Sequence, residues 1–177
     1  EKAINELNFD VKDKVMIDIG SSTGGFTDCA LQNGAKFVYA LDVGTNQLDY
    51  SLRTNKNVIL YEKTNLKSLN QTFFSENIDF VSCDVSFISV KNVFDVCRNF
   101  LKSKIKLMVL IKPQFECEGK SLSKKGIVKS EKVIDDVIEK IRLYALANKL
   151  EIISIIDSPI LGGDGNKEKL ALIKGVF

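Results

Sequence analysis

The chain contains no histidine and no tryptophan, and only two of its 177 residues are proline. Without histidine it cannot build a Ser–His triad, a Cys–His dyad or a histidine-containing zinc site. Its four cysteines form no Cys-x-x-Cys pair, so the spacing typical of zinc and redox motifs is also missing. We therefore expect no metal site, and reduced thiols in place of disulfides.

Long apolar runs are also missing. The longest unbroken run near the middle of the chain covers residues 107–111, whereas a membrane-spanning helix needs about 20 residues. No signal peptide is visible either, so we expect a cytoplasmic protein without a membrane partner. The chain begins at Glu1, inside a stretch with helical periodicity, and we expect that an N-terminal portion has been removed.

Charges of the two signs nearly cancel. The net charge is +2, with 27% charged and 45% hydrophobic residues. This composition suits one globular domain over residues 1–177 with a sizeable core. It provides no global field for attracting nucleic acid, so any RNA-binding surface must be local.

Hydrophobic periodicity predicts alternating strands and helices. We expect strands at residues 14–19, 37–42, 57–61, 78–83, 106–111, 150–156 and 170–176, and helices at 2–8, 25–32, 44–53, 90–102 and 131–148. A loop without a helix joins the last two strands, so we expect them to be antiparallel neighbours. The sequence thus predicts an α/β fold with a doubly wound, mostly parallel seven-stranded sheet and one antiparallel edge strand.

A glycine-rich turn after the first strand organises the predicted site. The segment starts at Asp18 and continues as Gly20, Ser21, Ser22, Thr23, Gly24, Gly25 and Phe26. Such a turn exposes backbone N–H groups to a ligand. The glycine spacing differs from the G-x-G-x-x-G dinucleotide motif, and no Gly-Lys-Ser/Thr follows. An acid before the turn and the missing lysine favour a cationic nucleoside, S-adenosylmethionine; the alternative is a plain tight turn.

Two further strand ends add polar groups to the same edge of the sheet. Asp42 follows Gly20 by about 20 residues, the spacing at which nucleoside-binding folds place the carboxylate for ribose hydroxyls. Val43 comes next, and Thr64 and Asn65 follow the third strand. We expect these residues to line the cofactor crevice, because ligands bind outside the carboxyl ends of the strands. A solvated strand end is the alternative interpretation of Asp42.

Three charged residues are the candidate catalytic groups. Asp84 and Lys112 end the fourth and fifth strands, and Glu168 precedes the last strand. If that strand is antiparallel, all three lie at one edge, where the two acids could orient the lysine. Such a lysine could remove the proton of an alcohol that accepts a methyl group, or stabilise the alkoxide as an ammonium. Each residue taken singly could also be an ordinary surface charge.

A long loop at residues 117–130 carries four lysines, Lys120, Lys124, Lys125 and Lys129, and shows no strong periodicity. Loops of this length are frequently functional. The lysines could bind RNA phosphates that flank a target nucleotide. A solvated loop is an equally weighted alternative.

Taken together, these segments resemble the TlyA, or hemolysin-A-like, ribosomal RNA 2′-O-methyltransferases, which are related to the FtsJ-type enzymes. Six blocks in the same order carry the resemblance: DIGSSTGGFTD at 18–28, ALDVG at 40–44, EKTN at 62–65, DVSFIS at 84–89, KPQFE at 112–116 and SPILGGDGNKE at 158–168. The family implies a Rossmann-like methyltransferase fold, S-adenosylmethionine as methyl donor and a ribose 2′-hydroxyl of ribosomal RNA as acceptor. Ribosomal RNA or ribosomal subunits are the implied partners.

The family also implies a Lys–Asp–Lys–Glu catalytic tetrad, of which Asp84, Lys112 and Glu168 match by motif. The first lysine of the tetrad would lie upstream of Glu1, and Lys2 does not match its position. The S4-like RNA-binding domain that usually precedes this domain is not in the chain, and Lys169 stands where an aromatic residue is expected. The alternatives are a membrane-acting hemolysin, which needs an amphipathic or apolar segment that is not found, and a non-catalytic nucleoside-binding module.

Overall fold

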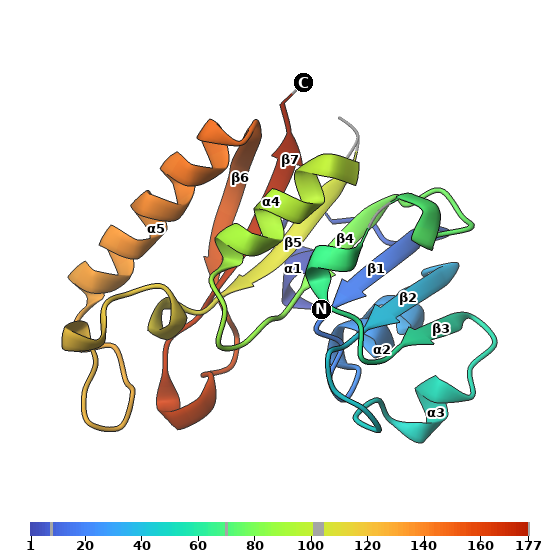
Figure 1. The fold of residues 1–177 in the computed structure, drawn as a ribbon, viewed down its shortest axis with the longest axis horizontal. Helices are drawn as coiled ribbons and strands as arrows, with labels where there is room; N and C mark the ends of the chain where they lie inside the picture. The colour runs from blue at the N-terminus through green and yellow to red at the C-terminus, as the bar shows by residue number, and fades with distance from the viewer. Residues whose placement is uncertain (8, 70, 101–104, 177) are drawn as a thin grey trace.

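The computed structural model describes residues 1–7, 9–69, 71–100 and 105–176. Within these residues seven strands form one sheet in the order β3-β2-β1-β4-β5-β7-β6 (Figure 1). The strands are β1 (Val15–Ile19), β2 (Phe37–Leu41), β3 (Val58–Tyr61), β4 (Phe80–Cys83), β5 (Lys106–Ile111), β6 (Leu150–Asp157) and β7 (Lys169–Gly175). Neighbouring strands from β3 to β5 pair in parallel, and β7 is antiparallel to both β5 and β6.

The expected mostly parallel sheet with an antiparallel edge is therefore confirmed. Helix α5 (Glu131–Ala147) connects β5 to β6, which is the edge strand of the sheet. The chain then turns back and inserts β7 between β5 and β6. The reversed strand thus lies one place inside the rim. Because β7 is reversed, its first residue Lys169 pairs with Ile111, the last residue of β5. The start of β7 consequently lies at the carboxyl ends of the parallel strands.

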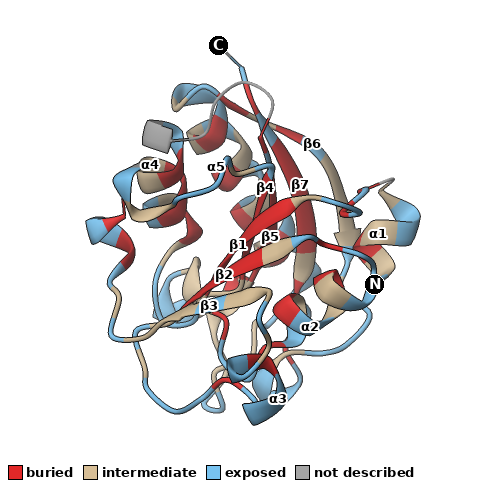
Figure 2. Ribbon diagram, turned by 90° about the vertical axis from the view of Figure 1, so that its right-hand side faces the viewer, coloured by how far each residue is buried: buried red, intermediate tan, exposed pale blue. Residues whose placement is uncertain are grey.

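Helices cover both faces of the sheet, and the strands between them are largely buried (Figure 2). Helix α4 (Val90–Phe100) packs with α5 on one face, through Val93, Phe94 and Cys97 of α4 and Val137 and Ile141 of α5. On the other face α1 (Lys2–Glu6) and α2 (Gly25–Gln32) bury Ala3 and Ala30 against Met16 and Val38. The predicted helix at residues 25–32 is confirmed at both ends.

One of the predicted helical connections is shorter than expected. The helix predicted at residues 44–53 forms only as its last turn, α3 (Tyr50–Arg53). The residues before it are held as a loop, since the Asp42 carboxylate accepts the Gly44 N–H at 2.7 Å and Asn46 has a φ of +56°. The predicted helix at 90–102 is observed to Phe100, and the rest of that prediction lies outside the described residues.

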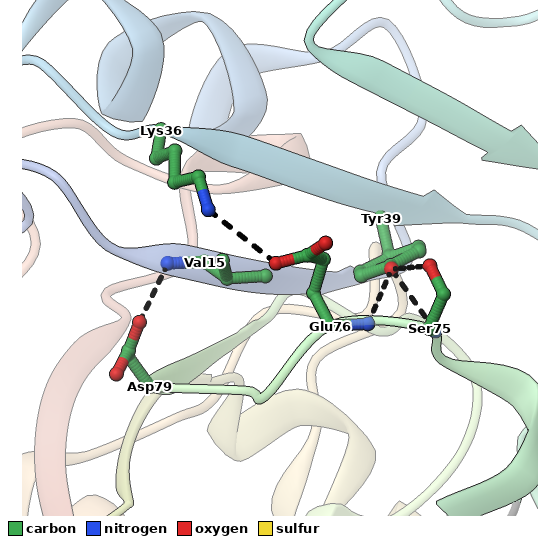
Figure 3. Close-up of polar contacts among 6 residues, drawn as sticks. All are labelled: Val15, Lys36, Tyr39, Ser75, Glu76 and Asp79. Carbon is green, nitrogen blue, oxygen red and sulfur yellow. Dashed lines mark hydrogen bonds and ion pairs between the residues drawn. The ribbon is translucent and has the colours of Figure 1, made fainter.

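Among its described residues, the connection from β3 to β4 contains two short 3-10 turns, η1 (Leu66–Ser68) and η2 (Gln71–Phe73), and no α-helix. Figure 3 shows how its end is attached to β1 and β2. The Tyr39 hydroxyl accepts the backbone N–H groups of Ser75 and Glu76 at 3.2 and 3.1 Å. The Asp79 carboxylate accepts the Val15 N–H at 2.8 Å. β4 then pairs with β1 on the side opposite β2, so the topological switch point lies between β1 and β4.

Candidate active site

The glycine turn after β1 is shaped by its contact with the segment that follows β4. Gly20 has a φ of +77°, and a Cβ atom there would lie 2.2 Å from the Asp84 carbonyl oxygen. Gly24, the N-cap of α2, has a φ of +104°, and its Cβ would lie 2.2 Å from Leu52 Cδ1. Only glycine fits at either position. The turn therefore packs tightly against β4 and α3.

Asp18 lies beneath this turn and is fully buried. Its carboxylate accepts hydrogen bonds from Thr27 Oγ1 and Ser82 Oγ, each at 2.6 Å. Burial raises the pKa of Asp18 to about 6, and the two hydroxyl bonds counteract only part of that effect. The residue does not line any of the cavities described below. The structure thus places Asp18 behind the predicted cofactor site, where it ties α2 and β4 to β1.

A cavity of about 350 Å³ opens beside Asp42 and is called the Asp42 cavity. The Asp42 carboxylate accepts the Ser22 N–H at 2.8 Å and the Gly44 N–H at 2.7 Å, so it joins two turns while facing the cavity. Val43 and Thr64 also line it, as predicted. Asn65 does not: its side chain caps η1 by accepting the Lys67 N–H at 2.9 Å.

A second cavity, of about 380 Å³, lies on the other side of the glycine turn and is called the Phe26 cavity. Its lining includes most of the predicted turn residues, namely Ser21, Ser22, Thr23, Gly25 and Phe26. Gly24 is absent from this lining because it faces α3. Both cavities share Gly20, Ser22 and Asp84, so an elongated ligand that fills them both would pass these residues. The buried Ser21 Oγ has no hydrogen-bond partner among the described residues and is available to such a ligand.

The third cavity, of about 490 Å³, contains two of the predicted catalytic residues, Lys112 and Glu168, and is called the Lys112 cavity. Lys112 Nζ lies 2.5 Å from Asp84 Oδ1 and donates a hydrogen bond to Ser86 Oγ at 2.9 Å. The lysine side chain is 14% exposed, and the Asp84 side chain, which reaches the other two cavities, is 34% exposed. The lysine–acid pair therefore stands where all three cavities meet.

Glu168 lines the same cavity, but its carboxylate contacts Gln114 and not the lysine that it was expected to orient. It is only 5% exposed, and Oε1 accepts a hydrogen bond from Gln114 Nε2 at 2.9 Å. Among the described residues, the Lys112 ammonium is paired with Asp84 and not with Glu168. The expectation that two carboxylates hold this lysine is thus correct for one of them. Gln114, two residues after Lys112, takes the place next to Glu168.

Phe87 also lies at the site, although the sequence did not predict it as a site residue. This residue lines both the Asp42 cavity and the Lys112 cavity, and 87% of its surface is exposed. Its ring lies 5.0 Å from the ring of Phe115, and its backbone has a φ of +64°. The exposed ring of Phe87, packed against the half-buried Phe115, offers a face on which a planar ring can stack. The indication available in the sequence was its position three residues after Asp84.

The lysines of the loop at residues 117–130 divide into two pairs. Lys120 forms an ion pair with Glu118 at 2.6 Å, and Lys129 Nζ donates to the Lys120 carbonyl oxygen at 2.7 Å. Lys124 and Lys125 are exposed at the tip, and neither is in an ion pair with another described residue.

Buried Asn166 anchors this tip to the loop that contains Glu168. Its side chain accepts the Val128 N–H at 3.0 Å and donates to the Gly126 carbonyl oxygen at 3.1 Å. In Figure 1 the two loops, gold and red, lie side by side at the lower left. The free lysines are therefore held next to the Lys112 cavity.

A family model described as FtsJ-like methyltransferase matches residues 1–174. The chain belongs to the FtsJ-like methyltransferase family. YqxC of Bacillus subtilis, which is named as an rRNA methyltransferase, is 48% identical over 171 residues, or 96% of this chain and 61% of YqxC. Hemolysin A of Brachyspira hyodysenteriae is 42% identical over 176 residues, which cover 97% of this chain and 72% of that protein.

Two further relatives extend this comparison. TlyA of Campylobacter jejuni, named as a 23S rRNA (cytidine-2′-O)-methyltransferase, is 44% identical over 133 residues, or 74% of this chain and 50% of TlyA. A solved structure from Streptococcus thermophilus, named as a hemolysin, superposes with a TM-score of 0.94 at 40% identity, covering 99% of this chain and 64% of that one. This FtsJ-like chain thus spans between half and three quarters of the length of these relatives.

The expected Rossmann-like methyltransferase fold is confirmed by more distant structures as well. A protein from Listeria monocytogenes that is named as an S-adenosylmethionine-dependent methyltransferase superposes with a TM-score of 0.70 at 15% identity. Among the described residues, no helix combines the length and apolar character needed to cross a bilayer. The same residues contain no cluster of acids and cysteines that could hold a metal ion.

S-adenosylmethionine, the cofactor of FtsJ-like methyltransferases, fits the residues that line the first two cavities. Asp42 offers a carboxylate for ribose hydroxyls, with Val43 beside it for an apolar ring. The unpartnered Ser21 hydroxyl and the exposed backbone of the turn lie in the Phe26 cavity, suitable for the amino-acid end. Asp84 lies between these two groups and would face the sulfonium charge.

Proposed function

We propose that this FtsJ-like domain transfers a methyl group from S-adenosylmethionine to a ribose 2′-hydroxyl of ribosomal RNA. The observation that carries the proposal is the Lys112–Asp84 pair, 2.5 Å apart, at the junction of the cofactor cavities and the Lys112 cavity. When bound, the cofactor supplies an electrophilic methyl group. The names of the TlyA and YqxC relatives support ribosomal RNA as the acceptor, and the TlyA name supports the 2′-oxygen.

Lys112 would act on the acceptor oxygen. An ammonium has three N–H donors. Here the Lys112 nitrogen is ion-paired with Asp84, and one N–H donates to Ser86 Oγ. A remaining N–H would donate to the acceptor oxygen and stabilise its developing negative charge, and the hydroxyl proton would then pass to solvent. In its neutral form the same nitrogen would instead accept the proton of the hydroxyl. Either way, Asp84 and Ser86 fix the position of the nitrogen.

The walls of the Lys112 cavity suit a nucleotide. The exposed ring of Phe87, supported by Phe115, offers a surface for a base that has left its stack. Gln114 holds the buried Glu168 in place in the lining of the same cavity, so that a carboxylate would be available near the ribose. These features favour a single, unstacked nucleotide as the acceptor over a base-paired one.

Lys124 and Lys125 would bind RNA phosphates that flank this nucleotide. Their ammonium groups have neither an ion-pair nor a hydrogen-bond partner among the described residues, whereas Lys120 is ion-paired and Lys129 bonds a carbonyl oxygen. Asn166 anchors their loop next to the cavity. Contacts of this kind position RNA without reading its sequence. Lys120 and Lys129, whose ammonium groups bond within the loop, would contribute less.

Methyl transfer itself tests the proposal. Ribosomal subunits are incubated with the chain and methyl-labelled S-adenosylmethionine, and the label in RNA is counted. We expect Lys112→Ala to lower the transfer rate at least about 100-fold while cofactor affinity, measured by calorimetry, stays nearly unchanged. Equal rates for the variant and the wild type would refute the role of Lys112. Absence of label with the wild type would refute the proposed activity.

A further inference from the structure

The segment that follows β4 forms a wall shared by two cavities. Val85, Ser86, Phe87 and Ile88 line the Asp42 cavity, and Ser86 and Phe87 also line the Lys112 cavity. This segment, residues 85–89, is called the arch. Any movement of the arch would alter the cofactor side and the acceptor side of the site together.

The arch is strained at Phe87. Its φ of +64° lies in the left-handed region, which a bulky side chain rarely adopts. Burial does not hold the residue there, because its ring is almost fully exposed. A strained backbone of this kind persists only where neighbouring groups fix it from several directions. The contacts of the arch therefore decide whether the shared wall keeps its shape.

Two of these contacts join the arch to the segment that carries Lys112. Ser86 Oγ accepts a hydrogen bond from Lys112 Nζ at 2.9 Å, and the ring of Phe87 lies against the ring of Phe115. Both contacts involve groups that face solvent or substrate. On their own they are weak restraints on a strained backbone.

The third contact is made by Glu116, at the end of the arch. Its carboxylate accepts the Val90 N–H at 2.6 Å and the Ser89 hydroxyl at 2.7 Å. Partial burial raises the pKa of the Glu116 carboxyl. Val90 is the first residue of the eleven-residue helix α4. A carboxylate at a helix N-terminus forms charge-assisted bonds and is stabilised by the helix dipole. Glu116 is thus the firmest attachment of the arch.

We propose that Glu116 is a positioning residue that holds the arch in its strained form and so keeps both the cofactor cavity and Lys112 in working geometry. Glu116 lines none of the three cavities and acts only through Ser89 and Val90. Without its carboxylate, the backbone at Phe87 relaxes toward negative φ and draws Ser86 away from Lys112. The inference rests on the proposed function, because the proposed function assigns the Asp42 cavity to the cofactor.

Calorimetric binding of S-adenosylhomocysteine to the chain tests this role without an RNA acceptor. We expect Glu116→Ala to weaken binding about tenfold, because two hydrogen bonds to a charged group are lost. The control Glu116→Gln should stay within about twofold of the wild type, since an amide still accepts the Val90 N–H and can pair with the Ser89 hydroxyl.

A second background separates this role from a general effect on folding. Glycine adopts a φ of +64° without strain, so the arch of Phe87→Gly needs less support. In that background we expect Glu116→Ala to weaken binding by no more than about twofold. The same tenfold loss in both backgrounds, or no loss in either, would overturn the inference. If the wild type itself did not bind S-adenosylhomocysteine, the proposed function would fail and this inference with it.

Discussion

Replacing Asp18 by Asn should stabilise the protein above about pH 6 and make its stability less dependent on pH. Asp18 is fully buried and has no cationic partner among the described residues; its hydrogen-bond donors are Thr27 and Ser82. Burial raises its pKa from 3.8 to about 6. Asn has nearly the same shape and cannot ionise, and the two hydroxyl groups can rotate to bond with an amide.

The sign and the size of the effect follow from proton linkage. Below pH 3.8 the carboxyl is protonated in both the folded and the unfolded chain, so it contributes no pH dependence. Between 3.8 and about 6 the folded protein keeps the proton that the unfolded chain has lost, and stability falls as pH rises. At about 1.4 kcal/mol per pH unit, the total loss is about 3 kcal/mol, and it persists at higher pH.

Urea unfolding of wild type and Asp18→Asn, measured from about pH 4 to about pH 7.5, tests this account. We expect the difference in free energy of unfolding between them to grow by about 2–3 kcal/mol over that range, in favour of the variant. Asp136→Asn, an exposed replacement of the same chemistry on α5, is the matched control and should show no such growth. A difference that does not change with pH would refute the reasoning.

Two further predictions concern ligand binding. Asp42→Ala should weaken S-adenosylmethionine binding at least about tenfold by calorimetry. Unchanged affinity would remove Asp42 from the site. The double variant Lys124→Ala/Lys125→Ala should bind ribosomal RNA more weakly and flatten the plot of log affinity against log salt by about 1.4. Lys120→Ala, the control in the same loop, should change that slope much less, and equal slopes for all variants would contradict the division of the loop lysines.

The carboxyl edge of the sheet could be predicted from the sequence, because strand periodicity and helical connections fix which residues end each strand. Asp42, Thr64, Asp84 and Lys112 follow from that rule alone. Predicting the position of Glu168 also requires the direction of β7. The loop without a helix between the last two strands indicated that this strand is antiparallel. Their gathering at one edge is thus a property of the topology.

The details of the contacts could not be predicted, because they depend on side-chain geometry. Nothing in the pattern distinguishes a carboxylate that faces a cavity, such as Asp42, from one buried beneath it, such as Asp18. Asn65 was equally suited to line the cavity or to cap a turn, and the structure shows the cap. Gln114 is placed in the site by its hydrogen bond to Glu168, and Phe87 is exposed there by a backbone with positive φ. Hydrophobic periodicity predicts neither feature.

The most direct test of the central claim is the chemical identity of the methylated nucleoside. Ribosomal RNA treated with this chain and labelled S-adenosylmethionine is hydrolysed to nucleosides, which are separated and identified by mass spectrometry. The Lys112–Asp84 pair beside a nucleotide-sized cavity predicts that the label is found on ribose, as a 2′-O-methylnucleoside. Label found only on bases would contradict the assignment of Lys112 to a ribose hydroxyl.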